Sequence, residues 1–192
     1  LALLAFSYRT AMAWAQTSGD SSPSGLRRYR DMFIARERHM DAELSTWRAT
    51  LPADARVVVL GHNLHLARRS ERLRFGRAPH DLEMWPSLGT LLDRAEPGST
   101  YVVWLLYERG TRLAPQPSGG CEARVETAAD HLEHAIAGDR PVFLPLDRAP
   151  SGSVVDRPIA FGTETSEGSG PIRPSVDAVV ILPEASAAGP RP

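Results

Sequence analysis

Four short apolar runs limit what this chain can fold into more than any other feature. They lie at residues 55–61, 99–110, 140–146 and 175–183. A continuous apolar run of this length, with many β-branched residues, is typical of a strand that is buried on both faces. Because helix-like segments separate the runs, the sequence predicts an α/β fold with a mostly parallel sheet flanked by helices.

A long amphipathic helix is expected before the first strand. Its apolar residues recur at spacings of three, four or seven, at Leu26, Tyr29, Phe33, Met40, Leu44 and Trp47, and no proline follows until Pro52. Shorter helices are predicted at 1–16, 65–75, 85–95 and 121–138. The 192 residues suffice for one domain, which we place at 1–183, with loops at 17–25 and 152–174 and a disordered tail at 184–192.

Composition excludes several classes of protein. The net charge of −1 gives no basic excess for nucleic acid, and no apolar stretch reaches the roughly 18 residues of a membrane span. The single cysteine, Cys121, cannot form an internal disulfide. No phosphate-binding loop or dinucleotide glycine pattern is present, so we expect no cofactor. We expect a cytoplasmic protein, although Ala13–Ala15 resembles an export-signal cleavage site.

The stretch "VVVLGHNLH" (Val57–His65) holds the best candidate for chemistry. In parallel α/β sheets, ligands bind where a strand passes into a helix. His62 and His65 follow such a strand at a spacing that puts both rings on one side of a helix. One imidazole could take a proton from water while the other orients that water or stabilises an oxyanion. Gly61 would permit a tight turn, and Asn63 could cap the helix or bind substrate.

The same histidine spacing also occurs at His131 and His134, where charged neighbours favour a solvated helix face. Spacing alone is therefore weak evidence for a site. Zinc is an alternative use of His62 and His65, but it needs a third ligand. His80, Asp81 and Glu83 could supply one, although no recognised zinc pattern is complete, so our prediction contains no metal.

Arg36 and Glu37 interrupt the apolar face of the long helix between Phe33 and Met40. Such a pair either reaches the edge of the helix with its charged groups or faces a polar cavity. In the second case Arg36 would bind an anionic or carbonyl group.

Several stretches, in this order, resemble the erythromycin esterase-like hydrolases. That family shows R-D-x-x-M-a-x-N on a long helix and then A-H-N-x-H after an apolar strand. The corresponding stretches here are "RERHMDAE" (Arg36–Glu43), "VVVLGHNLH" (Val57–His65), "SLGTLL" (Ser87–Leu92), "YVVWLLYERG" (Tyr101–Gly110) and "SVDAVVILPEASAAGP" (Ser175–Pro190). The departures are Glu37 for Asp, Glu43 for Asn, Gly61 for Ala and Leu88 for Met.

The resemblance implies hydrolysis of small-molecule esters or lactones, with opening of a macrolide ring as the best-known activity. It places His62 and His65 at the active site as catalytic residues, with Asn63 and Arg36 as supporting residues. Family members are about twice as long, and their N-terminal half carries a further Glu and His. The chain thus resembles the C-terminal part of such a protein and would be inactive alone. A metal-dependent hydrolase and a non-catalytic binding module are the alternatives.

Overall fold

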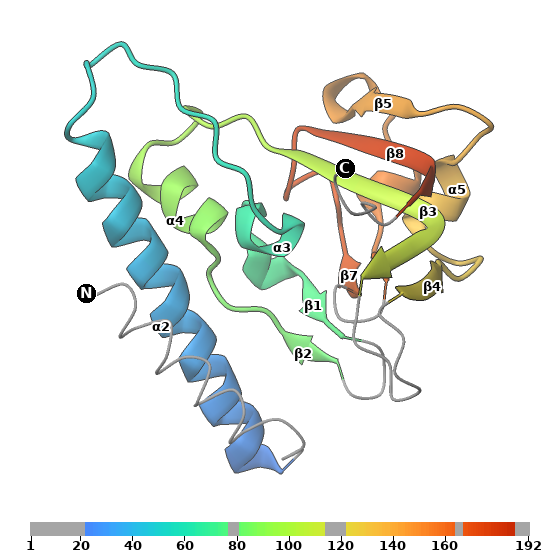
Figure 1. The fold of residues 1–192 in the computed structure, drawn as a ribbon, viewed down its shortest axis with the longest axis horizontal. Helices are drawn as coiled ribbons and strands as arrows, with labels where there is room; N and C mark the ends of the chain where they lie inside the picture. The colour runs from blue at the N-terminus through green and yellow to red at the C-terminus, as the bar shows by residue number, and fades with distance from the viewer. Residues whose placement is uncertain (1–21, 77–80, 114–121, 164–166, 187–192) are drawn as a thin grey trace.

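The computed structural model describes residues 22–76, 81–113, 122–163 and 167–186. The predicted helix at 1–16, Cys121, His80 and most of the predicted tail lie outside these ranges. Figure 1 shows one long helix beside a group of short strands and helices.

The strands are β1 (Arg74–Phe75), β2 (Leu82–Glu83), β3 (Val103–Leu113), β4 (Glu122–Glu126), β5 (Val142–Pro145), β6 (Ile159–Phe161), β7 (Gly168–Gly170) and β8 (Ala178–Ala185). The helices are α2 (Pro23–Arg48), α3 (Asn63–Leu66), α4 (Leu88–Ala95) and α5 (Leu132–Ile136). Single turns of 3-10 helix lie at Ser70–Arg72, Leu146–Arg148 and Val154–Asp156.

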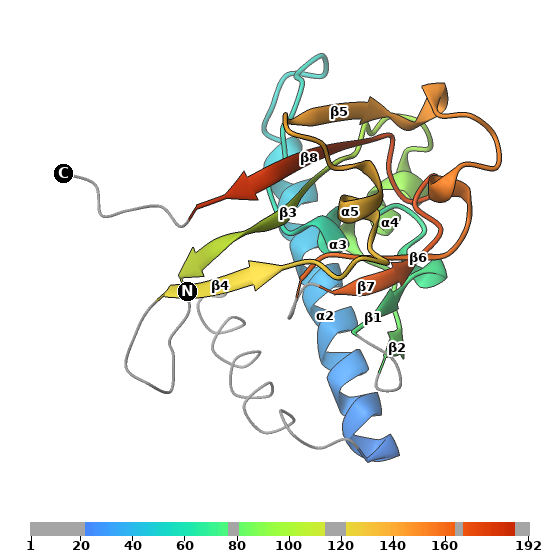
Figure 2. The same cartoon turned by 90° about the vertical axis from the view of Figure 1, so that its right-hand side faces the viewer.

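The strands form two four-stranded sheets. Sheet A has the order β2-β1-β7-β6, and all its neighbours are antiparallel. Sheet B has the order β4-β3-β8-β5, which Figure 2 shows from bottom to top, and only the pair β3–β8 is parallel. The predicted α/β fold with a mostly parallel sheet is therefore wrong. Apolar runs indicate that side chains require burial, but they do not fix the direction of the neighbouring strand.

Sheet B is apolar on both faces. One face packs into the core through the buried side chains of Trp104, Leu106, Val179 and Ile181. The other face carries Val103, Leu105 and Phe143, whose exposed fractions are 40%, 57% and 58%. Leu105 and Phe143 lie in one row because both pair with Val180. This double-sided apolar character gave β3 the sequence signature of a fully buried strand.

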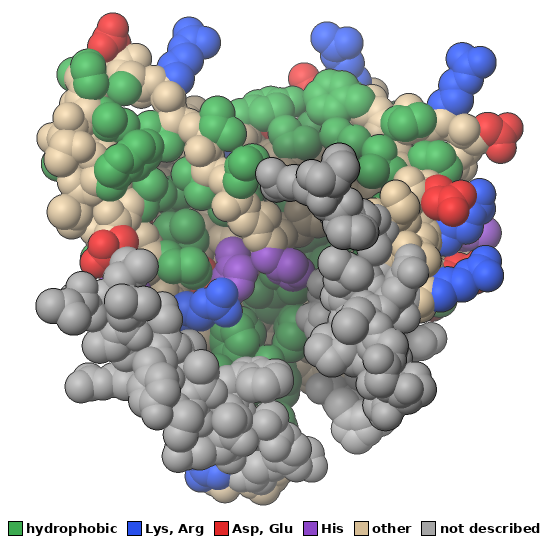
Figure 3. All heavy atoms as spheres, viewed as in Figure 1, with side chains coloured by type: hydrophobic (Ala, Val, Ile, Leu, Met, Phe, Trp, Pro, Cys, Tyr) green, Lys and Arg blue, Asp and Glu red, His purple; other side chains and the backbone are tan. Residues whose placement is uncertain are grey.

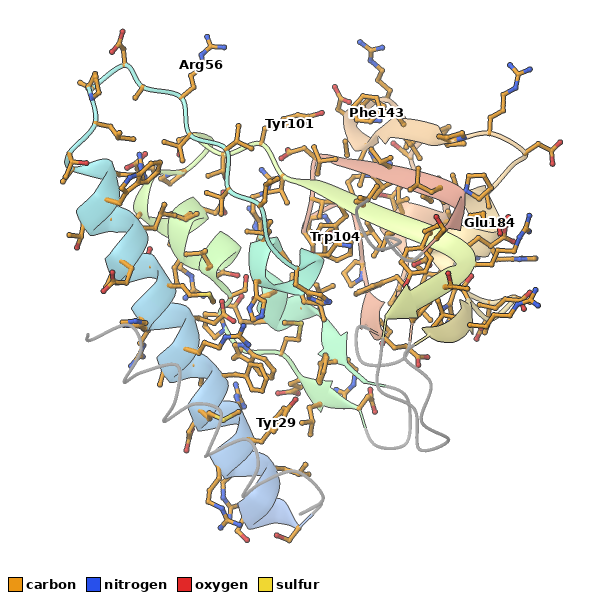
Figure 4. The ribbon with its side chains drawn as sticks, in the orientation of Figure 1. Tyr29, Arg56, Tyr101, Trp104, Phe143 and Glu184 are labelled. Atoms are coloured by element: carbon orange, nitrogen blue, oxygen red, sulfur yellow. The ribbon has the colours of Figure 1, made fainter. Side chains whose placement is uncertain are left out.

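Helix α2 covers the region predicted for the long helix. The Ser22 side chain accepts a hydrogen bond from the Gly25 N–H (3.1 Å), and Pro23 occupies the first turn. Figure 4 shows Tyr29 projecting from α2 toward β1 and β2. Its ring stacks on Phe75 at 6.5 Å and meets Trp85 edge-on at 6.3 Å. Aromatic contacts of this kind attach α2 to sheet A.

The strand predicted at 55–61 does not form in this structure. Residues 57–60 have no regular secondary structure, and they pair with no strand in the described ranges. The side chains of Val58 and Leu60 are 83% and 91% exposed. The prediction of a buried strand here is therefore wrong.

Three further predictions differ from the structure. Residues 121–138 form β4 and α5 rather than one helix, because Val125 faces the core between the exposed Arg124 and Glu126. Residues 65–75 divide into the end of α3, a 3-10 turn and β1. The predicted loop at 152–174 contains β6 and β7. In each case the strands are short and pair with distant residues.

Candidate functional site

The candidate site lies at α3, the short helix that follows the unpaired segment. His62 is the N-cap residue with an extended backbone (φ −64°, ψ 138°), and its carbonyl accepts from the His65 N–H at 2.9 Å. The two imidazole rings lie 5.9 Å apart at an interplanar angle of 72°. The structure thus brings the predicted pair together. Gly61 is not required for the turn, since an added methyl would meet Leu66 at an ordinary 3.7 Å.

Figure 3 shows histidine side chains beside each other near the centre of one face, with apolar side chains below them. Burial lowers the pKa of His62 below its ordinary value, and the nearby charges of His65 and Arg36 lower it further. The lowered pKa favours the neutral form of His62, which can accept a hydrogen bond at one ring nitrogen and donate one from the other.

Glu37 contacts the histidine pair, although the sequence did not predict it as a site residue. Its side chain is fully buried, and Oε1 is hydrogen-bonded to Nδ1 of His65. Its other oxygen, Oε2, accepts from the backbone N–H of Leu88 at 2.8 Å. The sequence did show that Glu37 is a charged residue on the apolar face of the long helix, three positions before Met40. It did not show that the partner of Glu37 is His65, which lies 28 residues away.

The first turn of α4 is fixed against the end of α3 by buried hydroxyl groups. Ser87 caps α4 by accepting from the Thr90 N–H (3.3 Å), and it donates to the Ala67 carbonyl (2.6 Å). Ser70 donates to the Trp85 carbonyl (2.7 Å) and accepts from the Ser87 N–H (2.9 Å). These bonds hold the Leu88 N–H in place beside the Glu37 carboxylate.

Arg36 lies on α2 close enough to His62 to affect its charge state. Its guanidinium carbon is 5.9 Å from the centroid of the Phe33 ring, a cation–π arrangement. Its positive charge lowers the pKa of His62 and that of Tyr29, although burial raises the pKa of Tyr29 overall. Arg36 is half-buried, and its effect on His62 places its charge near this histidine.

Asn63 connects α3 to the edge of β3. Its Nδ2 donates to the Leu105 carbonyl (2.8 Å), and its Oδ1 accepts from the Leu105 N–H (3.3 Å). The side-chain amide of Asn63 therefore makes the same two hydrogen bonds to Leu105 that the backbone of a neighbouring strand would make. Asn63 does not cap α3, whose N-cap residue is His62; its amide instead fixes α3 to β3.

The other histidine pair differs from our prediction in one respect. His134 is half-exposed and bound to Glu108 at 3.0 Å, as expected for a solvated face. His131, however, is buried, and its Nδ1 lies 3.1 Å from the Gly162 carbonyl. Within the described ranges, no group of three or more His, Cys, Asp or Glu side chains is arranged to hold a metal ion. No helix in those ranges is long and apolar enough to cross a membrane.

The chain is similar to known proteins both in its sequence and in its fold. The sequence matches the profile of the erythromycin esterase family over residues 8–178. No curated protein matches the chain. Among solved structures, the fold is similar to that of the erythromycin esterase EreC, determined as a histidine-to-asparagine mutant in its open conformation, with a TM-score of 0.54 and 17% identity. The match covers 80% of this chain and 38% of that one. The family profile extends over most of the sequence, and this chain therefore belongs to the erythromycin esterase family.

Proposed function

We propose that this chain forms part of a hydrolase that cleaves carboxylic esters or lactones, with His62 and His65 as catalytic residues. The observation that carries the proposal is the pair of adjacent imidazoles, one of them bound to a buried carboxylate, in a member of this family. The proposed substrate is a small molecule, and a macrolide lactone is the first one to test.

The proposed reaction is the addition of water to the ester carbonyl. One imidazole takes a proton from the water as the water adds to the carbonyl carbon, and the other donates a hydrogen bond to the carbonyl oxygen as negative charge develops there. The C–O bond to the alcohol group then breaks, and the protonated imidazole returns its proton to the leaving oxygen. Arg36 supplies a fixed positive charge beside His62, which favours an anionic transition state. Asn63 supports the site indirectly by fixing α3 against β3.

The chain spans 38% of the EreC chain. We propose that polypeptide beyond these 192 residues completes the site in the active protein. The exposed apolar side chains of Val58 and Leu60 support this proposal. In the complete protein, the additional polypeptide would cover them by pairing with this segment. The chain alone is then expected to bind a lactone at the histidines without turnover.

The test combines binding and turnover. Erythromycin and a simple δ-lactone are added to the purified chain, while the imidazole NMR signals are followed and hydrolysis is measured by mass spectrometry. We expect shifts at His62 and His65, none at His134, and no product. Turnover that His62→Ala abolishes would support the hydrolase but contradict the incomplete site. Unshifted His62 and His65 signals without product would contradict the proposed function.

A further inference from the structure

The ion pair between Arg68 and Asp177 connects the end of α3 to the start of β8. Arg68 is the second residue after α3, and Asp177 directly precedes β8. We propose that Asp177 is a positioning residue that, through Arg68, fixes α3 and its two histidines against the parallel pair β3–β8. This role rests on the proposed function, in which His62 and His65 act on one substrate.

The position of α3 depends on groups outside the helix. It contains only four residues, and an isolated helix of that length is not stable in water. At its start, the Asn63 amide binds the backbone of Leu105 on β3. At its end, the Ala67 carbonyl accepts from the Ser87 hydroxyl at α4, and Arg68 binds the segment ahead of β8. Arg68 therefore attaches this end of α3 to sheet B.

The carboxylate of Asp177 binds two segments at once. Its Oδ1 accepts from the Arg68 guanidinium at 2.7 Å, and its Oδ2 accepts from the Val102 N–H at 2.6 Å. Val102 directly precedes β3, and its carbonyl accepts from the backbone N–H of Asp177 at 2.9 Å. A single side chain thus connects α3 to the beginnings of both parallel strands.

Arg68 is bound through both its main chain and its side chain. Its backbone N–H donates to the Ser175 carbonyl at 2.8 Å, two residues before Asp177. The side chains of the ion pair are only 18% and 23% exposed, and the buried Nε of Arg68 has no hydrogen-bond partner within the described ranges. The guanidinium therefore depends on Asp177, and loss of this partner leaves a partly buried charge uncompensated.

Asp177→Asn tests this role because the two side chains have the same shape. The amide oxygen can still accept from the Val102 N–H, but the NH₂ group cannot accept from Arg68. We expect the end of α3 to separate from sheet B and the His62 ring to become more exposed. The pKa of His62 should then rise toward its ordinary value, since burial is the largest cause of its lowering.

An NMR titration of the His62 ring measures this pKa in the wild-type chain and in the variant. A second variant, Arg68→Met, removes the same ion pair, leaves Asp177 bound to Val102, and should raise the pKa of His62 as well. A wild-type pKa at His62 in either folded variant would overturn the proposal. Failure of both variants to fold would also contradict it, because the pair would then support the whole fold rather than α3.

The matched control is Asp81→Asn, which removes a different Arg–Asp pair, Arg74 with Asp81 at sheet A. It should leave the pKa of His62 unchanged. The titration needs no substrate, so failure of this proposal is distinguishable from failure of the proposed hydrolase activity. In any active form of the protein, Asp177→Asn should lower kcat roughly 10²-fold, as displacement of reacting groups by about 1 Å does. A purely structural role would instead lower the yield of folded enzyme and leave the kcat of each folded molecule unchanged.

Discussion

The charge state of His62 depends on residues from two segments far apart in the sequence. Burial is the largest cause of its lowered pKa, followed by the charges of His65 and Arg36. Protonation of His62 destabilises the folded state, because the pKa of His62 is lower there than in the unfolded chain. The stability that neutral His62 contributes is thus complete above pH 6.5 and is lost as the pH falls through the lowered pKa.

Replacing Arg36 with Met should raise the pKa of His62, because the neutral side chain keeps much of the bulk but removes the repulsive charge. The rise should be partial, since burial remains as the main cause. An NMR titration of the His62 ring measures it. Arg38→Met, an exposed position on the same helix, is the control and should have a smaller effect. An unchanged or lower pKa in Arg36→Met would contradict the proximity of the two groups.

At this residue scale, much of the candidate site could be predicted from the sequence. The order Gly-His-Asn-x-His after an apolar run identified His62 and His65, and helical spacing identified Arg36 as a charge on an apolar face. Glu37 shares that face, but its contact with His65 depends on how α2 packs on α3. The hydrogen bonds of Asn63 to Leu105 likewise depend on packing, which no local pattern records.

Among the elements, the junction of α3 and α4 determines the position of the Leu88 N–H. Gly89 permits the junction because a methyl group there would lie 2.1 Å from the Leu66 carbonyl oxygen. Backbone atoms of Leu66 and Ala67 occupy that space, so a larger side chain at this position would have to displace one of the two helices. This packing, together with the Ser70, Ser87 and Thr90 hydroxyl groups, makes the junction a rigid support.

Gly89→Ala should therefore lower the free energy of unfolding by on the order of 3 kcal/mol. It should also displace Leu88 from Glu37, which NMR would detect at the Leu88 amide. Gly138→Ala is the control, since nothing lies within 4 Å of its added methyl. Chemical denaturation compares the two variants. Equal stabilities would show that α3 and α4 are farther apart than described.

Helix α5 carries a buried carboxyl group that is only half satisfied. Oε1 of Glu133 accepts from the Gly162 N–H at 2.6 Å, but its buried Oε2 has no partner in the described ranges. Burial raises the pKa of Glu133 above its ordinary value. The stability that this group contributes is thus complete below pH 4.5 and is lost as the pH rises through the raised pKa.

Glu133→Gln should stabilise the fold at pH 8, because it removes a buried charge and keeps the acceptor for Gly162. We expect a gain on the order of 1 kcal/mol in unfolding free energy and a flatter dependence on pH above 4.5. Urea denaturation at several pH values measures both. Glu126→Gln, at an exposed position on β4, should change neither. A less stable Glu133→Gln at pH 8 would show that the ionised carboxylate is well accommodated.

The shortest strands were harder to predict from the sequence than the long helix. The long helix α2 has its periodicity within one segment, so local pattern reveals it. The strands β1, β2, β6 and β7 contain two or three residues each and exist through their pairing with distant segments. Strands of two or three residues are too short to show the alternation of apolar and polar residues that identifies a strand in a sequence. The direction of pairing in sheet B likewise depends on how the chain returns to β3 along β8.

For the whole molecule, the most informative feature is the apolar surface that the described elements leave open. The outer face of sheet B carries Val103, Leu105 and Phe143. Val58 and Leu60 lie on the unpaired segment at residues 57–60. Figure 4 places Tyr101 and Phe143 on the side of the molecule opposite Tyr29, and Figure 3 shows hydrophobic side chains over the upper half of that view. Exposed apolar surface of this extent favours association.

Self-association of the chain should therefore depend on Val58 and Leu60. A Val58→Ser/Leu60→Ser double variant removes two exposed apolar side chains without removing buried contacts, since they are 83% and 91% exposed. We expect weaker self-association in sedimentation equilibrium at an unfolding free energy within about 0.5 kcal/mol of wild type. Trp47→Ser, at a single half-exposed apolar residue on α2, is the control and should associate as wild type does. Unchanged association of the double variant would mean that other surfaces drive it. A large loss of stability would mean that the segment is packed in solution, so that residues 57–60 already have the neighbour that the proposed completing polypeptide would supply.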